Sequence, residues 1–344
     1  MTKVGLIGCG KIGQVRHLPE YAANPHCTIA ALYDVNMERA QALAEQYGAT
    51  AYPSVEALLA SDIDAVSICS SNNTHAELTM KALRAGKHVL CEKPMATTLA
   101  ECEAMVQAAR EAGKRLMIGH NQRLAGAHMK AKELIEAGEI GKVLTFKTAF
   151  CHGGPETWSV DPGLNTWFFD KKRAAMGAMA DLGVHKTDLI QFLTGQKIVE
   201  VSAKLCVLDK KFADGTPITV DDNAFCIYRM DGGAMGTMTV SWTDYGAEDN
   251  STVLWGTKGV LRIYDHPEHT LVLIRKGGET VYYDVDQIQT NDNQTASGVI
   301  DMFVNAVMDE NAPYITGESA LAAMRAVFAA IESSEKGCAV RVNQ

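Results

Sequence analysis

The stretch Lys3-Val4-Gly5-Leu6-Ile7-Gly8-Cys9-Gly10-Lys11-Ile12-Gly13 decides the fold of this chain. An apolar strand runs here into a turn with glycines spaced as G-x-G-x-x-G and then into a helix, which is the context that this dinucleotide-binding fingerprint requires. Gly8 permits the tight turn, Gly10 lets the backbone approach a pyrophosphate, and Gly13 lets the helix pack closely on the strand. The N-terminus of the helix then faces the phosphates, so Lys11 and Ile12 are also expected at the cofactor.

The next apolar run, residues 28–33, ends in an acidic residue. This residue, Asp34, lies 21 positions after Gly13. A carboxylate at that distance accepts hydrogen bonds from the adenosine ribose hydroxyls and repels a 2'-phosphate, so NAD is predicted and NADP is less favoured. In the alternative interpretation Asp34 only begins a turn.

Strands and helices alternate to about residue 120. Apolar runs at 65–69, 89–91 and 116–118 predict buried strands. Helices are expected at 37–47, at 74–85 behind a Thr74–Glu77 capping box, and at 100–112 before Gly113. This alternation implies βαβ units, so we predict an α/β Rossmann domain with a doubly wound parallel sheet over residues 1–121.

The pattern changes after residue 121. Helices near 129–137, 297–308 and 319–336 surround strand-like segments at 143–151, 199–207, 224–230, 235–242, 252–255, 260–264, 271–274 and 280–283. Short turns such as 231–233 and 276–278 favour antiparallel pairing. We predict a C-terminal α+β domain, residues 122–344, with a large open and mostly antiparallel sheet. One face of this sheet is expected to meet another subunit or to be covered by helices.

Composition restricts the function classes. The 344 residues are 47% hydrophobic and 21% charged, as in an ordinary globular protein, and the net charge of −9 argues against a nucleic-acid partner. Nine scattered cysteines suggest neither a disulfide framework nor a metal site, which fits a reducing cytoplasm. The first strand begins too early for a signal peptide, and no apolar run is long enough for a membrane span.

The tripeptide Glu92-Lys93-Pro94 directly follows the buried run 89–91. Ligands of open α/β sheets bind where parallel strands end. Pro94 imposes an extended or cis turn that aims Lys93 toward such a ligand. The alternative is a charged loop with a turn proline.

Asp181 and His185 lie four positions apart at the start of a predicted helix that ends at Gly195, so they share one face. A carboxylate and an imidazole held near a lysine can remove a hydroxyl proton while hydride leaves the same carbon. A capped core histidine and a surface pair are the alternatives.

With these motifs in this order, the chain resembles the glucose-fructose oxidoreductase / inositol dehydrogenase / rhizopine catabolism (Gfo/Idh/MocA) family over essentially its whole length. The resemblance rests on the glycine fingerprint with His17 and Pro19, on Asp34, and on the segments 71–75, 86–94, 119–123, 138–143 and 181–185. It implies a Rossmann domain, an open-sheet domain, and a homodimer or homotetramer built through that sheet.

The resemblance also implies site residues. Lys93 would bind the reacting oxygen, Asp181 would hold the substrate, and His185 would be the acid/base. The cofactor would meet a further group near its nicotinamide end: Ser71, Asn72, His75, Glu92 and Lys93. The family usually has proline at the position of Ser71, which leaves this loop less rigid here.

Substrate contacts are less well marked in the sequence. Asn121 and Arg123 follow a strand end, and His152, Trp158 and Trp167 precede the predicted catalytic helix. Tryptophan faces suit sugar rings, but packing or interface roles explain them equally well.

Three functions remain open at this point. The first is an NAD-dependent dehydrogenase that oxidises a secondary hydroxyl of a cyclic polyol, sugar or sugar derivative. The second is a redox-neutral enzyme with transient oxidation by NAD. The third, a non-catalytic NAD-binding regulator, has no need for Lys93, Asp181 and His185 together.

Overall fold

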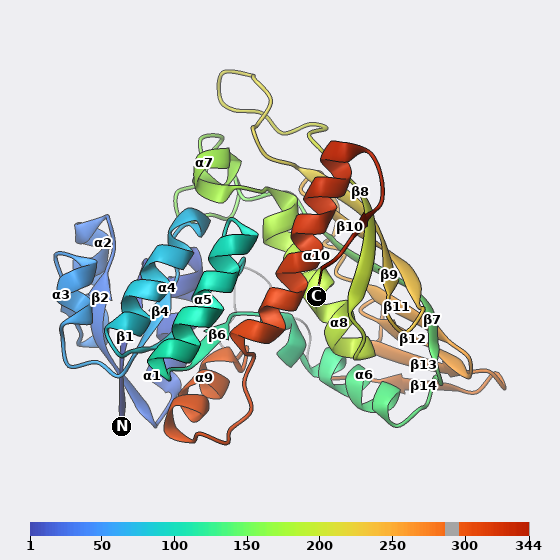
Figure 1. Ribbon diagram of the computed structural model, residues 1–344, viewed down its shortest axis with the longest axis horizontal. Helices are drawn as coiled ribbons and strands as arrows, with labels where there is room; N and C mark the ends of the chain where they lie inside the picture. The colour runs from blue at the N-terminus through green and yellow to red at the C-terminus, as the bar shows by residue number, and fades with distance from the viewer. Residues whose placement is uncertain (286–295, 344) are drawn as a thin grey trace. The chain divides into compact units, whose positions relative to one another are not determined.

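A computed structural model describes residues 1–285 and 296–343 of the chain (Figure 1). These residues form two compact units. The first unit contains 1–121, 158–161 and 296–321, and the second contains 122–157, 162–285 and 322–343. Residues 296–321 therefore belong with the N-terminal unit, although they lie in the range expected for the second domain.

The first unit is built on a six-stranded parallel sheet in the order β3-β2-β1-β4-β5-β6. Its strands are β1 (Thr2–Ile7), β2 (Cys27–Tyr33), β3 (Thr50–Ala51), β4 (Ala65–Ile68), β5 (His88–Cys91) and β6 (Leu116–Ile118). The strand order reverses between β1 and β4, which is where open α/β sheets bind ligands. The predicted doubly wound Rossmann sheet is confirmed.

The helices α1 (Leu18–Ala23), α2 (Met37–Tyr47), α3 (Val55–Leu59), α4 (His75–Arg84) and α5 (Leu99–Ala112) lie in the connections between these strands. The later helix α9 (Val299–Met308) also belongs to this unit. The side chain of Thr98 caps α5 by accepting from the N–H of Glu101 at 3.2 Å, and Gly113 ends the helix in a left-handed conformation. The boundaries predicted for α2 and α5 are therefore correct to within one residue.

The capping box predicted at Thr74 is wrong. A 3-10 turn (Asn72–Thr74) precedes α4, and the backbone of Thr74 is helical, with φ −105° and ψ −9°. An N-cap residue needs an extended backbone to reach the first turn. The Thr74 hydroxyl instead contacts the Ser70 hydroxyl at 2.6 Å and donates to the Ser71 carbonyl at 2.8 Å.

The second unit is built on a nine-stranded sheet in the order β14-β13-β12-β11-β7-β10-β9-β8-β15. Its strands are β7 (Val143–Cys151), β8 (Ile198–Cys206), β9 (Asn223–Met230), β10 (Met235–Ser241), β11 (Thr252–Gly256), β12 (Gly259–Ile263), β13 (Leu271–Arg275), β14 (Thr280–Tyr283) and β15 (Val340–Arg341). All pairs are antiparallel except β7 with β10. The mostly antiparallel sheet is confirmed, and the parallel pair at its centre was not predicted.

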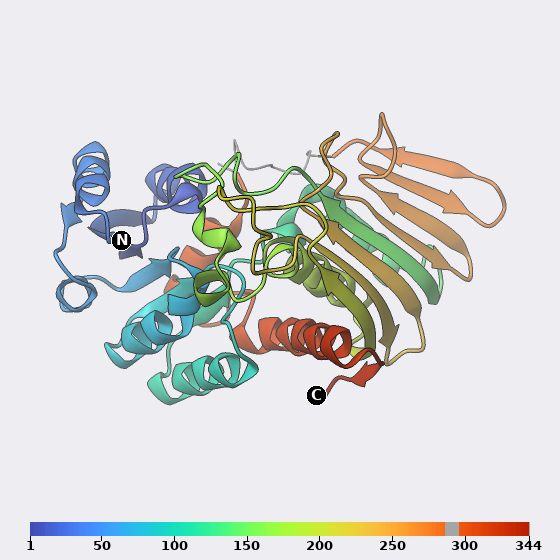
Figure 2. The same cartoon turned by 90° about the horizontal axis from the view of Figure 1, so that it is seen from above.

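Helices cover one face of this sheet, and the other face is open in the part of the chain that the structure describes (Figure 2). The covering helices are α6 (Gly126–Glu136), α8 (Val184–Thr194) and the second-unit part of α10 (Gly317–Lys336). The hydroxyls of Ser333 and Ser334 on α10 accept hydrogen bonds from the N–H groups of Ala203 and Leu205 on β8 at 2.9 and 2.8 Å. The short helix α7 (Lys171–Ala174) carries the basic triplet 171–173 in exposed positions.

Candidate active site

The glycine-rich turn after β1 forms a cradle in the first unit. Gly8 has φ +95°, and a Cβ there would lie 2.6 Å from the carbonyl carbon of Cys69. A Cβ on Gly13 would lie 3.0 Å from the main-chain oxygen of Gly8. A Cβ on Gly10 would instead point into open space, with the Cys69 oxygen nearest at 4.0 Å. Packing requires the outer two glycines, and the space over Gly10 fits the close approach of a pyrophosphate.

Asp34 is buried, and its carboxylate holds this cradle in place. Oδ2 accepts a hydrogen bond from the N–H of Cys9 at 2.6 Å, and Oδ1 accepts one from the N–H of Asn36 at 2.8 Å. An ionised carboxylate has about four acceptor sites, so these bonds leave capacity for ribose hydroxyls. Arg39 Nη1 lies 4.0 Å from Oδ1, while its Nη2 is paired with the exposed Asp161 at 2.9 Å.

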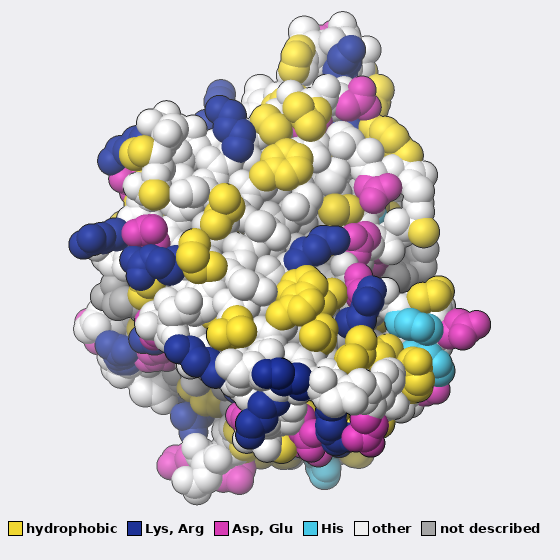
Figure 3. Space-filling view, turned by 90° about the vertical axis from the view of Figure 1, so that its right-hand side faces the viewer, with side chains coloured by type: hydrophobic (Ala, Val, Ile, Leu, Met, Phe, Trp, Pro, Cys, Tyr) yellow, Lys and Arg dark blue, Asp and Glu magenta, His cyan; other side chains and the backbone are white. Residues whose placement is uncertain are grey.

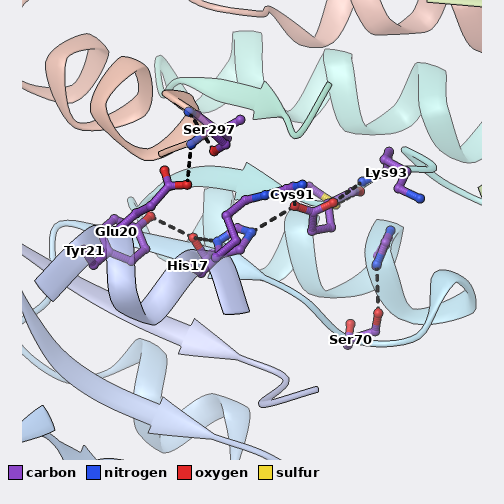
Figure 4. A network of polar contacts seen from close by, with 12 residues as sticks. His17, Glu20, Tyr21, Ser70, Cys91, Lys93 and Ser297 are labelled. Carbon is purple, nitrogen blue, oxygen red and sulfur yellow. Dashed lines mark hydrogen bonds and ion pairs between the residues drawn. The ribbon is translucent and has the colours of Figure 1, made fainter. Parts of the chain in front are cut away.

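Glu92 is the centre of a buried polar network in the first unit. Figure 4 shows His17, Tyr21 and Lys93, which surround it. Its Oε1 accepts from Arg16 Nη1 at 3.1 Å and lies 2.9 Å from His17 Nε2. His17 Nδ1 lies 3.1 Å from the Ser67 hydroxyl, which lies 2.7 Å from the Tyr21 hydroxyl. Because a carboxylate only accepts, His17 must carry a proton on Nε2, which donates to Glu92.

This network keeps Glu92 ionised. Burial by itself would raise the pKa of the carboxyl, but the charge of Arg16, the bond and charge of His17, and the charge of Lys93 lower it to about 2. The N–H of Lys93 donates to Glu92 Oε2 at 3.2 Å. A Cβ on Gly119, just after β6, would lie 2.9 Å from Oε1, so only glycine leaves room for the carboxylate. The anion of Glu92 therefore fixes the backbone from which Lys93 projects.

Lys93 follows the end of β5, and its side chain is directed away from the Glu92 network (Figure 4). The Lys93–Pro94 peptide bond is cis, one of the two geometries expected for it. His75 connects this turn with the loop after β4, because Nδ1 lies 2.8 Å from the Pro94 oxygen and Nε2 lies 3.1 Å from the Ser70 oxygen. Burial lowers the pKa of His75 despite these two contacts, which raise it.

Ser71 and Asn72 lie in the same loop. Ser71 has φ −70° and ψ 149°, values that a proline adopts without strain. Its carbonyl accepts from the N–H of Thr74 at 2.9 Å, and its hydroxyl donates to Asn73 Oδ1 at 2.9 Å. Asn72 is buried in the turn. The serine therefore keeps the backbone conformation that proline would impose.

Asp181 and His185 lie on one continuous helical element of the second unit. Asp181 is in a π-helical turn (Met179–Gly183) that leads into α8, and His185 is in the first turn of α8. Both residues are buried. Nε1 of the fully buried Trp242, which follows β10, donates to Asp181 Oδ2 at 3.1 Å. The ring of Phe150 on β7 lies 6.0 Å from the ring of His185. The sheet thus orients both side chains of the predicted pair.

Lys186, next to His185, is fully buried and was not singled out by the sequence. Its Nζ donates to the Asn250 carbonyl at 2.9 Å and lies 5.8 Å from the centre of the Phe150 ring. Burial lowers its pKa to about 7, against the opposing effect of Asp249 and Glu248. Motif and spacing gave no signal for Lys186, Trp242 or Arg16, because each owes its role to a partner distant in the chain.

The side chain of Arg123 is occupied within the second unit. Its Nε donates to Asp188 Oδ2 at 2.6 Å, its Nη2 pairs with Oδ1, and the side chain of Asp188 is only 2% exposed. A bidentate buried pair of this kind gives Arg123 a structural role and argues against the predicted substrate contact. Asn121 is the last residue of the segment 1–121 of the first unit, and it begins the 3-10 turn Asn121–Leu124.

The three aromatic candidates occupy different surroundings. His152 is largely buried at the end of β7, with its ring 5.6 Å from that of Phe150. Trp167 stacks on Phe168 at 3.9 Å, and the guanidinium of Arg173 lies 5.8 Å from its ring centre. Trp158 belongs to the first unit, so it is not grouped with the other two.

Within residues 1–285 and 296–343, no group of three His, Cys, Asp or Glu side chains is placed to hold a metal ion. Over the same residues, no helix combines the length and the apolar character that crossing a bilayer requires.

Comparison with known proteins agrees with this geometry. Residues 2–120 match the family model described as an oxidoreductase family with an NAD-binding Rossmann fold, and residues 128–262 match the GFO/IDH/MocA C-terminal domain. The chain is 27% identical to myo-inositol 2-dehydrogenase of Thermotoga maritima, with 99% of each chain covered. It is 31% identical to levoglucosan dehydrogenase of Pseudarthrobacter phenanthrenivorans, over 81% of this chain and 79% of that one. A solved structure of levoglucosan dehydrogenase in complex with NADH superposes with a TM-score of 0.87 at 25% identity, covering 100% of this chain and 99% of the other. The chain therefore belongs to the Gfo/Idh/MocA family of NAD-binding oxidoreductases.

Proposed function

We propose that this protein is an NAD-dependent dehydrogenase that oxidises a secondary hydroxyl of a cyclic polyol, sugar or sugar derivative. One observation carries the proposal: Trp242 orients the Asp181 carboxylate on the helical element that also bears His185. The names of the relatives, inositol and levoglucosan dehydrogenases, support this substrate class.

Each of the three residues has a distinct chemical role in the proposal. Lys93 donates a hydrogen bond to the reacting oxygen and stabilises the negative charge that develops on it. His185 accepts the hydroxyl proton, and Asp181 holds the substrate and orients His185. NAD, when bound in the cradle of residues 8–13, supplies the hydride acceptor. Asn121, His152, Trp158 and Trp167 are proposed substrate contacts.

We further propose that the protein acts in the cytoplasm. The support is that all nine cysteines are free thiols, and eight of them are buried or half-buried. Such thiols fit a reducing compartment.

A homodimer or homotetramer formed through the open face of the nine-stranded sheet is also part of this proposal. Figure 3 shows apolar side chains spread over this side of the molecule among charged ones. Phe225, Ile227, Met235 and Trp255 on the sheet are 39–51% exposed. Light scattering after size exclusion should give a dimer or tetramer, and Ile227→Glu should dissociate it. Met129→Glu, at an equally exposed methionine on α6, is the control and should leave the assembly intact. A monomeric wild-type protein would refute the assembly.

The activity is tested by nicotinamide absorbance with a panel of inositols, aldoses and sugar derivatives, using NAD and NADP separately. Lys93→Ala and His185→Ala should each lower turnover by orders of magnitude while the affinity for NAD is retained. Lys81→Ala and His26→Ala, which change exposed residues of the same types, are the matched controls.

The results of the panel assay distinguish the dehydrogenase from the redox-neutral enzyme and from the regulator. Unchanged turnover in Lys93→Ala or His185→Ala would refute the assignment of that residue. Bound NAD that resists dialysis and is not reduced by any panel member would instead favour a redox-neutral enzyme. Binding of NAD with no chemical change in any substrate would favour a regulator.

A further inference from the structure

The N-terminal residues of the helical element that bears Asp181 and His185 are hydrogen-bonded to one residue from another part of the chain, Asp221. The N–H of Gly177 donates to Asp221 Oδ1 at 2.8 Å, and the N–H of Met179 donates to Asp221 Oδ2 at 2.7 Å. The intervening N–H of Ala178 donates to the main-chain oxygen of Asp221 at 2.8 Å. The first N–H groups of a helix have no partner within the helix, so one aspartate here satisfies three consecutive donors.

The backbone at this helix start is tightly constrained. Ala175 has φ +65° and ψ −45°, a conformation that is strained for a residue with a Cβ. A Cβ on Gly177 would lie 1.8 Å from the main-chain oxygen of Asp221, so only glycine allows the two segments to meet. Strain of this kind persists only where surrounding contacts hold it, and the three bonds to Asp221 are such contacts.

The next residue, Asp222, holds Trp242 by a main-chain hydrogen bond. The main-chain oxygen of Asp222 accepts from the N–H of Trp242 at 2.8 Å, and Trp242 Nε1 in turn donates to Asp181. The fully buried carboxylate of Asp222 accepts three more main-chain bonds, from Leu208, Asp209 and Lys210, at 2.8–2.9 Å. Residues 221 and 222 thus fix both the helix that carries Asp181 and the indole that orients its carboxylate.

We propose that Asp221 is a positioning residue for the reaction: by capping residues 177–179 it sets the positions of Asp181 and His185. This inference rests on the proposed function of that pair. Acid/base catalysis depends on the placement of the reacting groups, and a displacement of about 1 Å can cost about 100-fold in rate. Asp221 itself touches neither substrate nor cofactor in the proposal.

The test compares Asp221→Asn and Asp221→Ala with the wild-type enzyme and the substrate found in the panel assay. Asparagine keeps one acceptor oxygen and alanine keeps none, so kcat should fall about 10-fold and about 100-fold, respectively. The dissociation constant for NAD should stay within about twofold, because the cradle of residues 8–13 lies in the other unit. Hydrogen exchange at the amides of residues 177–179, measured without substrate, should speed up in the same order.

Asp214→Asn is the matched control, because Asp214 also accepts a main-chain N–H, from Thr216 at 2.9 Å, but lies in an exposed turn of the same connection between β8 and β9. It should leave kcat unchanged.

An unchanged kcat in Asp221→Ala with faster exchange would overturn the inference and leave the proposed function standing. A loss of NAD affinity that parallels the loss of kcat in the near-isosteric Asp221→Asn would also overturn it, as a general structural defect. A wild-type protein that oxidises no panel member would overturn the proposed function and this inference with it.

Discussion

Replacing Glu92 by glutamine removes the carboxylate that pairs with Arg16 and His17 and leaves the shape of the side chain nearly unchanged. In the folded protein the pKa of Glu92 is about 2, against an ordinary value of 4.5. The difference corresponds to about 3 kcal/mol of stability at neutral pH. Breaking a buried ion pair by removing one partner costs about 3–5 kcal/mol, and Glu92→Gln would leave Arg16 without this counter-charge. The two routes agree, so the free energy of unfolding should fall by about 3 kcal/mol.

The lowered pKa of Glu92 also determines how the stability difference between wild type and Glu92→Gln depends on pH. A carboxylate whose pKa is lowered on folding contributes stability above its unfolded pKa and loses it as the pH falls toward its folded pKa. The gap between wild type and Glu92→Gln should therefore shrink from about 3 kcal/mol at pH 7 to about 1 kcal/mol at pH 3. Urea denaturation followed by circular dichroism over this pH range measures the gap.

Glu77→Gln is the matched control for this measurement. The side chain of Glu77 is 67% exposed and pairs with Lys81 across one helical turn at 2.8 Å. Such surface pairs contribute about 0.5 kcal/mol or less, so this variant should have nearly wild-type stability. A gap for Glu92→Gln that is below about 1 kcal/mol at pH 7, or that does not change with pH, would refute the ion-pair reasoning.

Three further changes have definite expected outcomes. Ser71→Pro should fold, and its free energy of unfolding, measured by thermal denaturation, should rise by up to about 1 kcal/mol. The reason is that φ of Ser71 is already −70° and its N–H has no hydrogen bond within the described residues; a lower free energy of unfolding would contradict this. Asp34→Asn should lower the NAD-to-NADP affinity ratio by about 10-fold in nucleotide titrations, because the repulsion of a 2'-phosphate is lost while Arg39 remains; an unchanged ratio would speak against the role of Asp34 in selection. Trp242→Phe should lower kcat/KM by about 10-fold, since the donor that orients Asp181 is gone; an unchanged kcat/KM would show that this bond does not affect the reaction.

The sequence predicted the first unit well because its signals are local. The glycine fingerprint, the apolar strands and the alternation of strand and helix each lie within a few dozen residues, and they predict the doubly wound parallel sheet that the structure shows. The error at Thr74 arose because a capping box is read from residue types alone. The backbone there enters α4 through a 3-10 turn, and that turn depends on bonds among Ser70, Ser71 and Thr74.

The strands of the second unit and their mostly antiparallel pairing were predictable, but the order of the strands in the sheet was not. The hairpin turns identify antiparallel neighbours, such as β9 with β10, but no local signal places β7 beside β10. That parallel pair brings together segments about 90 residues apart in the chain. It also sets Phe150, whose ring lies beside His185, opposite Val240 on β10, two residues before Trp242.

The buried carboxylates explain why the sequence motifs identified the acceptor residues of the site but not their hydrogen-bond donors. Glu92 and Asp181 are buried acceptors that the motifs marked, and a buried acceptor must be supplied with donors. Those donors are the guanidinium of Arg16 and the indole of Trp242, and each lies more than 60 positions from its acceptor. Asp221, which is half-buried and which no motif marked, accepts from the main-chain N–H groups of Gly177 and Met179. A motif therefore identifies the buried carboxylates, whereas the donors that stabilise their negative charge are known only once the fold is known. Substitutions at those donors, Arg16 and Trp242, test the chemistry of the site most directly.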